Sequence, residues 1–465
     1  MYIFTLNIPD MIKERAGERV IKKIGSSHVI WFPESNRWME FKEPAWFIYK
    51  RIENGQNEQS LKDQLVRRYG LPQKEALRFL REVTNGIKLA VSPSVSSNPG
   101  REHETECTGL DNHTFTPGNR RYVTRHYLIN QKHITIDYGT PYLEFYIHRP
   151  FAHLETHRKP AEENLRIRLF AKKTGEGGTD SNATVSNATV SNAAVSNAAD
   201  GTKSGSKAKG SQAAGSKKTG SVNARCYYLQ SEALPGGSSR SFRFEESGLL
   251  KHRLYTTITS YIYGIPEEVW MSFIHASALT NGREALLLPS ASGSGKSTIT
   301  ALLQLPPDKS IYGSRNDLFF MSDDFTAIAA ESAKAYPFPA AINVKEGSFD
   351  AIKHYYDTSR DADANYIEPA GSKARFLCPR LPEKNPYGAQ PVKNIIFIKY
   401  NPGVTFRLSK LDTLSALAAF HEEAWVSQNP VHARRFIDWF ATLDCHRLEY
   451  TDSRKAVQVI RNLLE

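Results

Sequence analysis

Short segments rich in aromatic and β-branched residues, separated by turn-forming residues, open the chain and predict three strands. They are "ERVIKKIG", "HVIWFP" and "RWMEF". Apolar residues then recur at helical spacing in "EPAWFIYKRIENG", "NEQSLKDQLVRRYG" and "LPQKEALRFLREVTNGI". The first helix is expected to end at Asn-Gly, and the second at Gly70. Three strands followed by three helices predict a small α+β region with a winged-helix arrangement over residues 1–90.

The next two stretches differ sharply in polarity. Residues 91–120 are rich in Ser, Pro, Asn and Gly, and we expect them to form a linker. Residues 121–173 return to strand-like sequence in "RRYVTRHYLI", "HITIDYG" and "YLEFYIHRP", which predicts a β-rich segment.

A low-complexity tract then interrupts the chain at residues 174–222. It contains "SNATVSNATVSNAAVSNAAD", a five-residue repeat in four copies, followed by a Gly/Ser/Lys/Ala stretch. One valine per copy, with no other large apolar residue, cannot bury a core. We therefore expect a disordered insertion rather than a pentapeptide solenoid.

Residues 223–465 alternate between strand-like and helix-like patterns, which predicts an α/β region. "CYYLQSEAL" and "SFRFEE" are typical of strands, and "LYTTITSYIYG" is typical of a helix. "EEVWMSFIHASALT" predicts a further strand. The apolar run in "EALLLPS" predicts a buried strand, and "STITALLQL" predicts the helix after it.

Between that strand and that helix lies "SASGSGKS", residues 290–297. A glycine-rich loop between a strand and a helix is the context in which such a motif binds phosphate. The loop's backbone N–H groups and the helix N-terminus would face the phosphates, Lys296 would reach the β- and γ-phosphates, and the Ser297 hydroxyl would bind Mg²⁺. The candidate nucleotide-binding residues are Ser290, Ser292, Gly293, Ser294, Gly295, Lys296, Ser297 and Thr298.

One position of the loop departs from the standard pattern, because Ser290 stands where glycine is usual. The substitution matters only if the backbone there needs a positive φ, for which glycine is strongly preferred. A second motif, an acidic one, supports a nucleotide site. In "LFFMSDDFTAI", Asp323 and Asp324 follow a short apolar run. Adjacent side chains on a strand point in opposite directions, so one carboxylate could bind the metal and the other act as general base toward an acceptor hydroxyl.

The composition of the chain indicates its net charge and the compartment in which it is expected to work. The chain has 465 residues and a formal net charge of +11. The surplus of positive charge is concentrated in residues 1–90 and in the lysines of 201–221. The lysine-rich segment is either a solvated tether or a segment that attracts acidic partners. Four scattered cysteines form no CxxC pair, charge appears too early for a secretory signal, and no apolar run approaches ~20 residues. We expect a cytoplasmic protein with no membrane partner.

The segment "FIHASALTNGREALLLPSASGSGKSTITALL", followed by "FMSDDFTAI", resembles the HPr kinase/phosphorylase family, which shares a nucleotide-binding core with phosphoenolpyruvate carboxykinase. The resemblance implies an α/β P-loop kinase core, ATP and Mg²⁺, and a base from the aspartate pair that activates a serine hydroxyl. It also adds His275 to the catalytic candidates, which are then Asp323, Asp324, His275 and Lys296. The metal candidates are Ser297, Asp323 and Asp324.

The match covers residues 223–465 well and 121–171 weakly, and it has departures. Alanine follows His275 where the family usually has glycine, and "FPAAINVKEGSFD" does not match the family's acidic and arginine motif. Lys373 and Arg375 are candidate phosphate clamps by position alone. These departures leave HPr itself, and the reverse phosphorylase reaction, open.

Residues 1–90 resemble the PqqD-like family of peptide-recognition elements, which bind a leader peptide as an added strand. Together the two resemblances imply a serine kinase acting on a ribosomally made precursor peptide or small protein, with other peptide-modifying enzymes and an oligomeric state as open possibilities. Two alternatives remain: a nucleotide-binding scaffold that presents a peptide, and a DNA-binding winged-helix regulator. A nucleic-acid partner is the less expected, because no helix of residues 57–88 carries a clean basic face.

Overall fold

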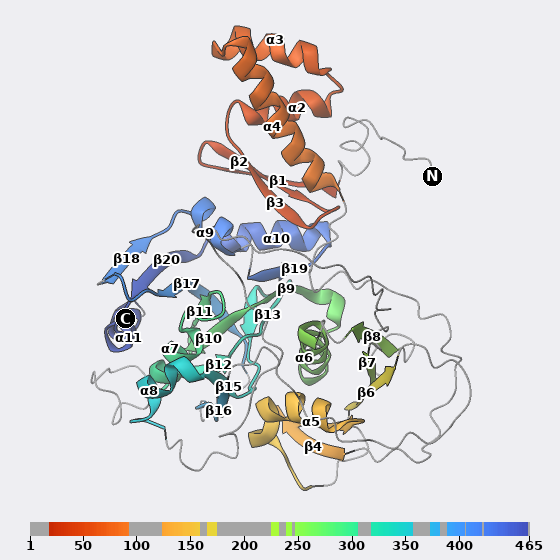
Figure 1. Ribbon diagram of the computed structural model, residues 1–465, viewed down its shortest axis with the longest axis vertical. Helices are drawn as coiled ribbons and strands as arrows, with labels where there is room; N and C mark the ends of the chain where they lie inside the picture. The colour runs from red at the N-terminus through yellow and green to blue at the C-terminus, as the bar shows by residue number, and fades with distance from the viewer. Residues whose placement is uncertain are drawn as a thin grey trace, which may run out of the picture.

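The computed structural model shows a mixed α/β protein with several sheets (Figure 1). It describes residues 18–92, 123–158, 165–173, 225–231, 239–243, 247–305, 318–356, 373–381, 388–404, 406–420 and 423–463. The expected linker, from residue 93 on, and the expected insertion at 174–222 lie outside the described residues. Within the described ranges, no helix is long and apolar enough to cross a membrane.

The N-terminal region, residues 18–92, has the three strands and three helices that its sequence predicts. The strands β1 (Val20–Ile24), β2 (Ser27–Phe32) and β3 (Arg37–Phe41) form an antiparallel sheet in that order. The helices α2 (Ala45–Glu53), α3 (Glu58–Tyr69) and α4 (Gln73–Val91) follow. Asn57 caps α3 by accepting from the Ser60 N–H, and Gly70 ends it at a φ of 67°.

Strand β2 is covered on both faces, and its alternating side chains enter two different cores. Ile30 and Phe32 pack with the helices of the N-terminal region. Val29 and Trp31 pack instead into the core of the following α/β region, which includes Phe436 of α10 (Pro430–Phe440). In Figure 1 the sheet of the N-terminal region accordingly lies against α10.

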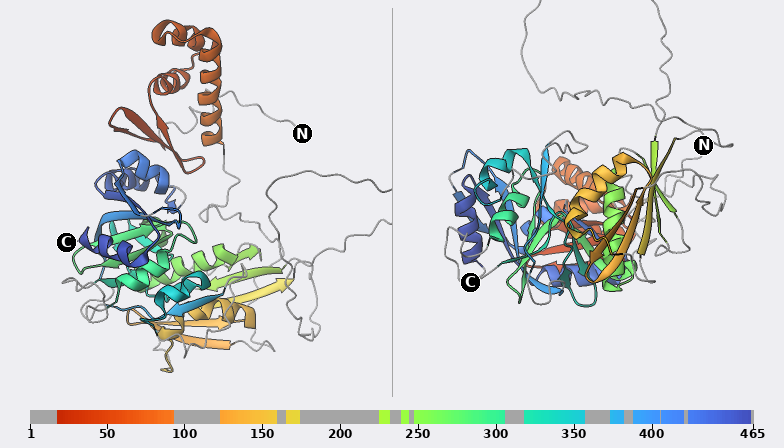
Figure 2. Two further views of the ribbon diagram at one scale, coloured as in Figure 1. Left: turned by 60° about the vertical axis from the view of Figure 1, so that its left-hand side comes forward. Right: turned by 90° about the horizontal axis from the view of Figure 1, so that it is seen from below.

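A five-stranded sheet follows, in the order β4-β5-β6-β7-β8. Its strands are β4 (Val123–Ile129), β5 (Lys132–Tyr138), β6 (Leu165–Lys173), β7 (Arg225–Ser231) and β8 (Ser239–Arg243). Segments on either side of residues 174–222 thus pair directly, β6 with β7. Helix α6 (Ser247–Tyr263) packs between this sheet and the central one (Figures 1 and 2).

One expected strand of this region is wrong. "YLEFYIHRP" forms the helix α5 (Pro141–His148) and a following 3₁₀ turn, η2 (Arg149–Leu154). Thr140 caps the helix by accepting from the Leu143 N–H, and Pro141 occupies its first turn, where proline is well tolerated. Leu143 and Ile147 are four residues apart and both buried, which is a helical repeat rather than a strand repeat.

The central sheet has ten strands, in the order β12-β10-β11-β17-β14-β13-β9-β19, with β20 beside β17 and β18 beside β20. Their bounds are β9 (Trp270–Ile274), β10 (Ala276–Thr280), β11 (Ala285–Pro289), β12 (Phe319–Ser322), β13 (Thr326–Ala329), β14 (Lys334–Tyr336), β17 (Gln390–Tyr400), β18 (Phe406–Lys410), β19 (Ala424–Val426) and β20 (Asp444–Tyr450). The strand expected in "EEVWMSFIHASALT" is therefore two strands, broken at His275.

The remaining elements surround this sheet. They are η5 (Glu267–Val269), α7 (Lys296–Leu303), β15 (Ile342–Lys345), η6 (Glu346–Ser348), α8 (Phe349–Ile352), β16 (Ala374–Leu377), α9 (Thr413–Phe420) and α11 (Ser453–Asn462). The expected buried strand and the helix after the loop are confirmed as β11 and α7. Helix α7 packs with α11 and with β15, and this packing fixes the direction in which the helix leaves the loop.

Candidate functional site

The topology brings three segments to one edge of the central sheet. Strand β10 lies between β11 and β12 and is antiparallel to both. The start of β10 therefore meets the ends of its two neighbours: Ala276 lies opposite Pro289, and Ala278 lies opposite Ser322. His275 precedes β10, the glycine-rich loop follows β11, and the two aspartates follow β12, so all three arrive at the same edge.

The glycine-rich loop between β11 and α7 uses two left-handed glycines. Gly293 has a φ of 86° and Gly295 a φ of 91°, which residues with a Cβ rarely adopt. The carbonyl of Ser294 accepts from the Tyr400 N–H at 3.0 Å and from the Tyr450 hydroxyl at 3.1 Å. Two neighbouring strands, β17 and β20, thereby hold the loop in shape.

Ser290 is accommodated without a left-handed backbone. Five non-glycine residues of the described chain have a positive φ, and Ser290 is not among them. Its hydroxyl donates to the Pro289 carbonyl and accepts from the Ile398 N–H at 3.0 Å, inside the protein. The serine thus supplies a partner to a buried amide of β17, an interaction that glycine could not make.

Asp323 and Asp324 lie in the turn beyond β12, so strand alternation is the wrong reason for their different directions. Asp324 has a φ of 61°, and this left-handed conformation separates the two carboxylates. Asp323 is buried, whereas the side chain of Asp324 is about one third exposed, at 32%. The turn therefore gives the two carboxylates different surroundings.

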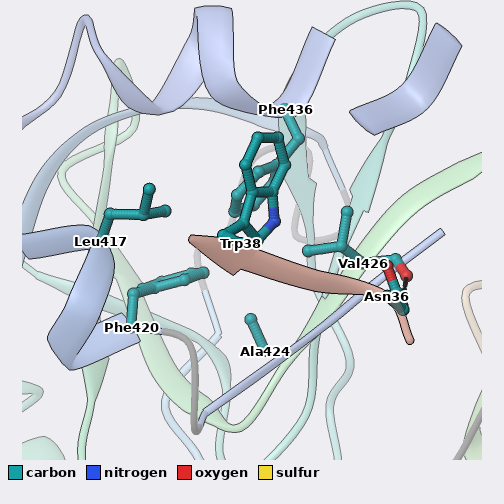
Figure 3. Close-up of a pocket in the computed structure, with 7 residues that line it drawn as sticks. All are labelled: Asn36, Trp38, Leu417, Phe420, Ala424, Val426 and Phe436. Atoms are coloured by element: carbon teal, nitrogen blue, oxygen red, sulfur yellow. Dashed lines mark hydrogen bonds between the residues drawn. The ribbon is translucent and has the colours of Figure 1, made fainter. Parts of the chain in front are cut away.

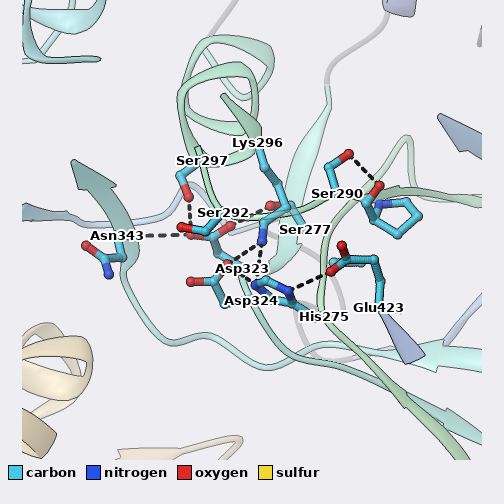
Figure 4. A network of polar contacts seen from close by, with 12 residues as sticks. His275, Ser277, Ser290, Ser292, Lys296, Ser297, Asp323, Asp324, Asn343 and Glu423 are labelled. Carbon is cyan, nitrogen blue, oxygen red and sulfur yellow. Dashed lines mark hydrogen bonds and ion pairs between the residues drawn. The ribbon is translucent and has the colours of Figure 1, made fainter. Parts of the chain in front are cut away.

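Asp323 faces the glycine-rich loop and is held by three donors (Figure 4). One carboxylate oxygen accepts from the Ser277 hydroxyl; the other accepts from the Ser297 hydroxyl at 2.9 Å and from the Asn343 N–H at 3.2 Å. Burial raises the pKa of Asp323, and the neighbouring Asp324 carboxylate raises it further.

Asp324 faces the two cationic side chains of the site. Its Oδ1 lies 2.5 Å from Lys296 Nζ and 3.3 Å from His275 Nε2. Burial alone would raise its pKa, but Lys296 and His275 hold the pKa of this carboxyl well below its usual range. Asp324 is therefore ionised at neutral pH.

His275 completes the cluster and is held from both sides of its ring. Its Nε2 lies 3.0 Å from Lys296 Nζ, and its Nδ1 lies 2.8 Å from a carboxylate oxygen of Glu423. Burial lowers the pKa of His275, but hydrogen bonds to Asp324 and Glu423 outweigh it and raise the pKa to about 9. The imidazole is then a second positive group beside the loop, next to Lys296.

The other candidates have partners that the sequence did not indicate. The Ser292 hydroxyl accepts from Lys345 Nζ at 2.8 Å, and the Thr298 hydroxyl donates to the Ser348 hydroxyl at 2.5 Å. Lys345 of β15 is thus a second lysine at the loop, in addition to Lys296.

The two clamps proposed by position have other neighbours. Lys373 Nζ lies 3.7 Å from a carboxylate oxygen of Glu346, and the Arg375 guanidinium lies 4.4 Å from the ring centre of Phe349. Neither contact involves a residue of the glycine-rich loop, so the assignment of these two residues as phosphate clamps gains no geometric support.

Sequence reasoning missed four residues of the site: Ser277, Asn343, Lys345 and Glu423. Ser277 had a usable signal, because it lies two positions after His275 and a strand repeats its faces at that interval. Glu423 is 148 residues from His275 and had none. Asn343 joins the site through its backbone N–H, which no side-chain pattern could reveal.

The residues present fit Mg²⁺ better than a metal with nitrogen or sulfur ligands. Asp323 and Ser297 offer a carboxylate and a hydroxyl oxygen next to each other, and Mg²⁺ is commonly bound by one or two protein oxygens together with phosphate and water. Among the described residues, no group of three or more His, Cys, Asp or Glu side chains could hold a metal without such help.

No protein-family model matches the sequence, and no curated protein matches it.

Proposed function

We propose that this chain is an ATP-dependent serine kinase with a core of HPr kinase/phosphorylase type, acting on a peptide or small protein. One observation carries the proposal: the lysine and serine of the glycine-rich loop each contact one of two adjacent aspartates. Lys296 contacts Asp324, and Ser297 contacts Asp323. A phosphate loop, a metal-binding carboxylate and a general base are the parts that phosphoryl transfer to an alcohol requires.

The surroundings assign different roles to the two aspartates. Asp323, beside Ser297, would hold Mg²⁺, which supplies neutralisation of the phosphate charge when bound. Asp324 is ionised and partly exposed, so it can accept the proton of a substrate serine. The serine oxygen then bonds to the γ-phosphorus, the bond from that phosphorus to the β,γ-bridging oxygen breaks, and ADP leaves with the bond's electron pair.

Lys296, His275 and Lys345 would stabilise the negative charge on the transferring group. Lys296 and His275 lie within 3.0 Å of each other beside the Asp324 carboxylate, and Lys345 reaches the loop at Ser292. Positive groups held in place before the reaction lower the barrier more than mobile ones do, because no reorganisation is needed.

The N-terminal region supports a peptide as the substrate class. Its three strands and three helices are compatible with a winged-helix, PqqD-like element, in which an extended peptide adds to a sheet edge. Of the two edge strands, β1 makes the closer backbone contact with α10, whereas β3 meets α10 through the Trp38 side chain. We therefore assign the peptide to the backbone edge of β3. The expected cytoplasmic location and reducing surroundings remain part of this proposal.

The test measures transfer from labelled ATP, with Mg²⁺, to serine-containing precursor peptides encoded beside this gene. Asp324→Asn should abolish transfer at saturating Mg²⁺ and ATP. Asp323→Asn should raise the Mg²⁺ concentration needed for half-maximal rate. Asp350→Asn is the matched control, because Asp350 is exposed and its carboxylate pairs with Lys353, away from the loop.

Deleting residues 1–92 should raise the KM for the peptide. Nucleotide binding by the intact chain, without transfer to any peptide, would instead favour the scaffold function.

A further inference from the structure

Glu423 holds His275 by its backbone as well as by its side chain. Its carbonyl accepts from the His275 N–H at 2.7 Å, and its carboxylate binds Nδ1 of the ring at 2.8 Å. The side chain of Glu423 is only 11% exposed, so the contact is largely shielded from water. A carboxylate on one ring nitrogen fixes the orientation of the imidazole ring. The other nitrogen, Nε2, then faces Lys296 and Asp324.

Glu423 immediately precedes β19, a three-residue strand at the edge of the central sheet. Strand β19 pairs on one side with β9, where Ala424 lies opposite Ile274. Two further hydrogen bonds tie it there: the Ser272 hydroxyl donates to the Trp425 carbonyl at 2.7 Å, and the Ser427 N–H donates to the Met271 carbonyl at 2.9 Å. A strand this short has few ladder bonds of its own, so additional contacts decide its position.

The N-terminal region supplies such a contact. Asn36 lies in the turn between β2 and β3, and its side-chain N–H donates to the Val426 carbonyl of β19 at 2.6 Å. Its side-chain oxygen accepts from the indole N–H of Trp31 at 2.8 Å, which fixes the direction of the amide. Asn36 is 8% exposed and has a φ of 53°, a conformation in which asparagine is common.

Apolar packing surrounds this hydrogen bond. Figure 3 shows a small pocket where the N-terminal region meets β19 and the helices α9 and α10. Trp38 of β3 points into it, toward Phe436 of α10, with ring centres 6.0 Å apart. The lining residues are Asn36, Trp38, Leu417, Phe420, Ala424, Val426 and Phe436. The turn of the N-terminal region and the strand that carries Glu423 into the site thus share one interface.

We propose that Asn36 and Glu423 are positioning residues for His275, so that the N-terminal region sets the geometry of the catalytic cluster in addition to capturing a peptide. The chain of contacts runs from Asn36 to the β19 carbonyl of Val426, along β19 to Glu423, and from Glu423 to the imidazole. The inference rests on the proposed function only in the role of His275 in phosphotransfer. The contacts themselves can be tested by a measurement that does not depend on phosphotransfer.

The same interface contains an ion pair that does not involve β19 and can serve for a control variant. Lys22 of β1 pairs with Asp438 of α10, and both side chains are partly exposed. Lys22→Met disturbs the docking of the N-terminal region without removing the contact to Val426. Asn36→Gly removes that contact while tolerating the left-handed backbone. Asn36→Asp keeps the acceptor for Trp31 and loses the donor, so it provides a second variant if the glycine variant unfolds.

The first measurement is the proton NMR signal of the His275 Nδ1–H in the full chain labelled with ¹⁵N-histidine, assigned by its loss in His275→Gln. We expect the signal to be lost in Glu423→Ala and retained in Glu423→Gln, whose amide oxygen can still accept. In both Asn36 variants its exchange with water should accelerate about fivefold, the equivalent of one hydrogen bond. Lys22→Met should leave it unchanged.

The second measurement is the kcat and KM of phosphotransfer. Asn36→Gly should lower kcat about fivefold, leaving the KM for ATP unchanged, and Glu423→Gln should retain more activity than Glu423→Ala. If both Asn36 variants match Lys22→Met in the exchange rate, the inference is overturned. If the NMR signals respond as expected but the unaltered chain transfers no phosphate, the positioning contacts stand and the proposed kinase function fails.

Discussion

Gly295 is the loop position at which a side chain should cost the most stability. It combines a φ of 91° with close contact to Tyr450: a Cβ added to Gly295 would overlap the tyrosine hydroxyl and lie 3.3 Å from the ring carbon that bears it. Tyr450 is 1% exposed, which limits its movement. Gly293 has a similar φ of 86° but has nothing within 4 Å of the corresponding Cβ. The two glycines therefore differ in packing and share the same backbone requirement.

Gly293→Ala should cost only the left-handed conformation, about 1 kcal/mol of unfolding free energy. Gly295→Ala should add an overpacking cost of about 1–3 kcal/mol, for a total of about 2–4 kcal/mol. Tyr450→Phe removes the overlapping hydroxyl together with its hydrogen bond to the Ser294 carbonyl, and by itself should cost about 1 kcal/mol. The double variant should then be about 1–3 kcal/mol more stable than the sum of the two single changes.

The assay is urea unfolding of the four variants and the unaltered chain, monitored by tryptophan fluorescence. Unfolding free energies are compared using one common slope of free energy against urea concentration. Nucleotide affinity, measured alongside, should fall more for Gly295→Ala than for Gly293→Ala, because displacing Tyr450 also releases the loop. Equal destabilisation by the two alanines would refute the packing argument. So would strict additivity between Gly295→Ala and Tyr450→Phe.

Three further outcomes are expected. Lys345→Met should weaken ATP binding about tenfold in an equilibrium titration, because it removes a positive charge that reaches the loop at Ser292; an unchanged affinity would exclude this role. Ser290→Ala should lower the unfolding free energy by about 1 kcal/mol in urea, since the buried Ile398 N–H loses its acceptor, and Ser290→Gly should not restore it. Burial lowers the pKa of His153 to about 4, so the unfolded chain takes up this proton first as pH falls from about 6.5 toward 4. Stability should drop in that window, and His153→Gln should make the drop smaller; an identical pH profile would contradict this.

The local patterns of this chain carry much of its secondary structure. The order of three strands and three helices follows from short β-branched segments and helical repeats, and Gly70 ends its helix as expected. The buried strand before the loop and the helix after it were equally readable, because their apolar runs and flanking turn residues agree. "YLEFYIHRP" misled because aromatic residues favour strands, while the deciding signal was the capping Thr140 and Pro141 just before it.

Sequence alone pointed to the glycine-rich loop and the aspartate pair, since each is a local motif, and the family resemblance added His275. Only the tertiary structure joins them, through a sheet order in which β10 separates β11 and β12 and delivers all three to one edge. It also decides which aspartate faces the loop, because a left-handed turn sets their directions. Glu423 and Asn36 carry no sequence signal, because their partners lie 148 and 390 residues away and are contacted through a ring nitrogen and a backbone carbonyl. Local propensity acts over a few residues, whereas a site of this kind is assembled by pairings between distant strands, and those are determined by the packing of the whole chain.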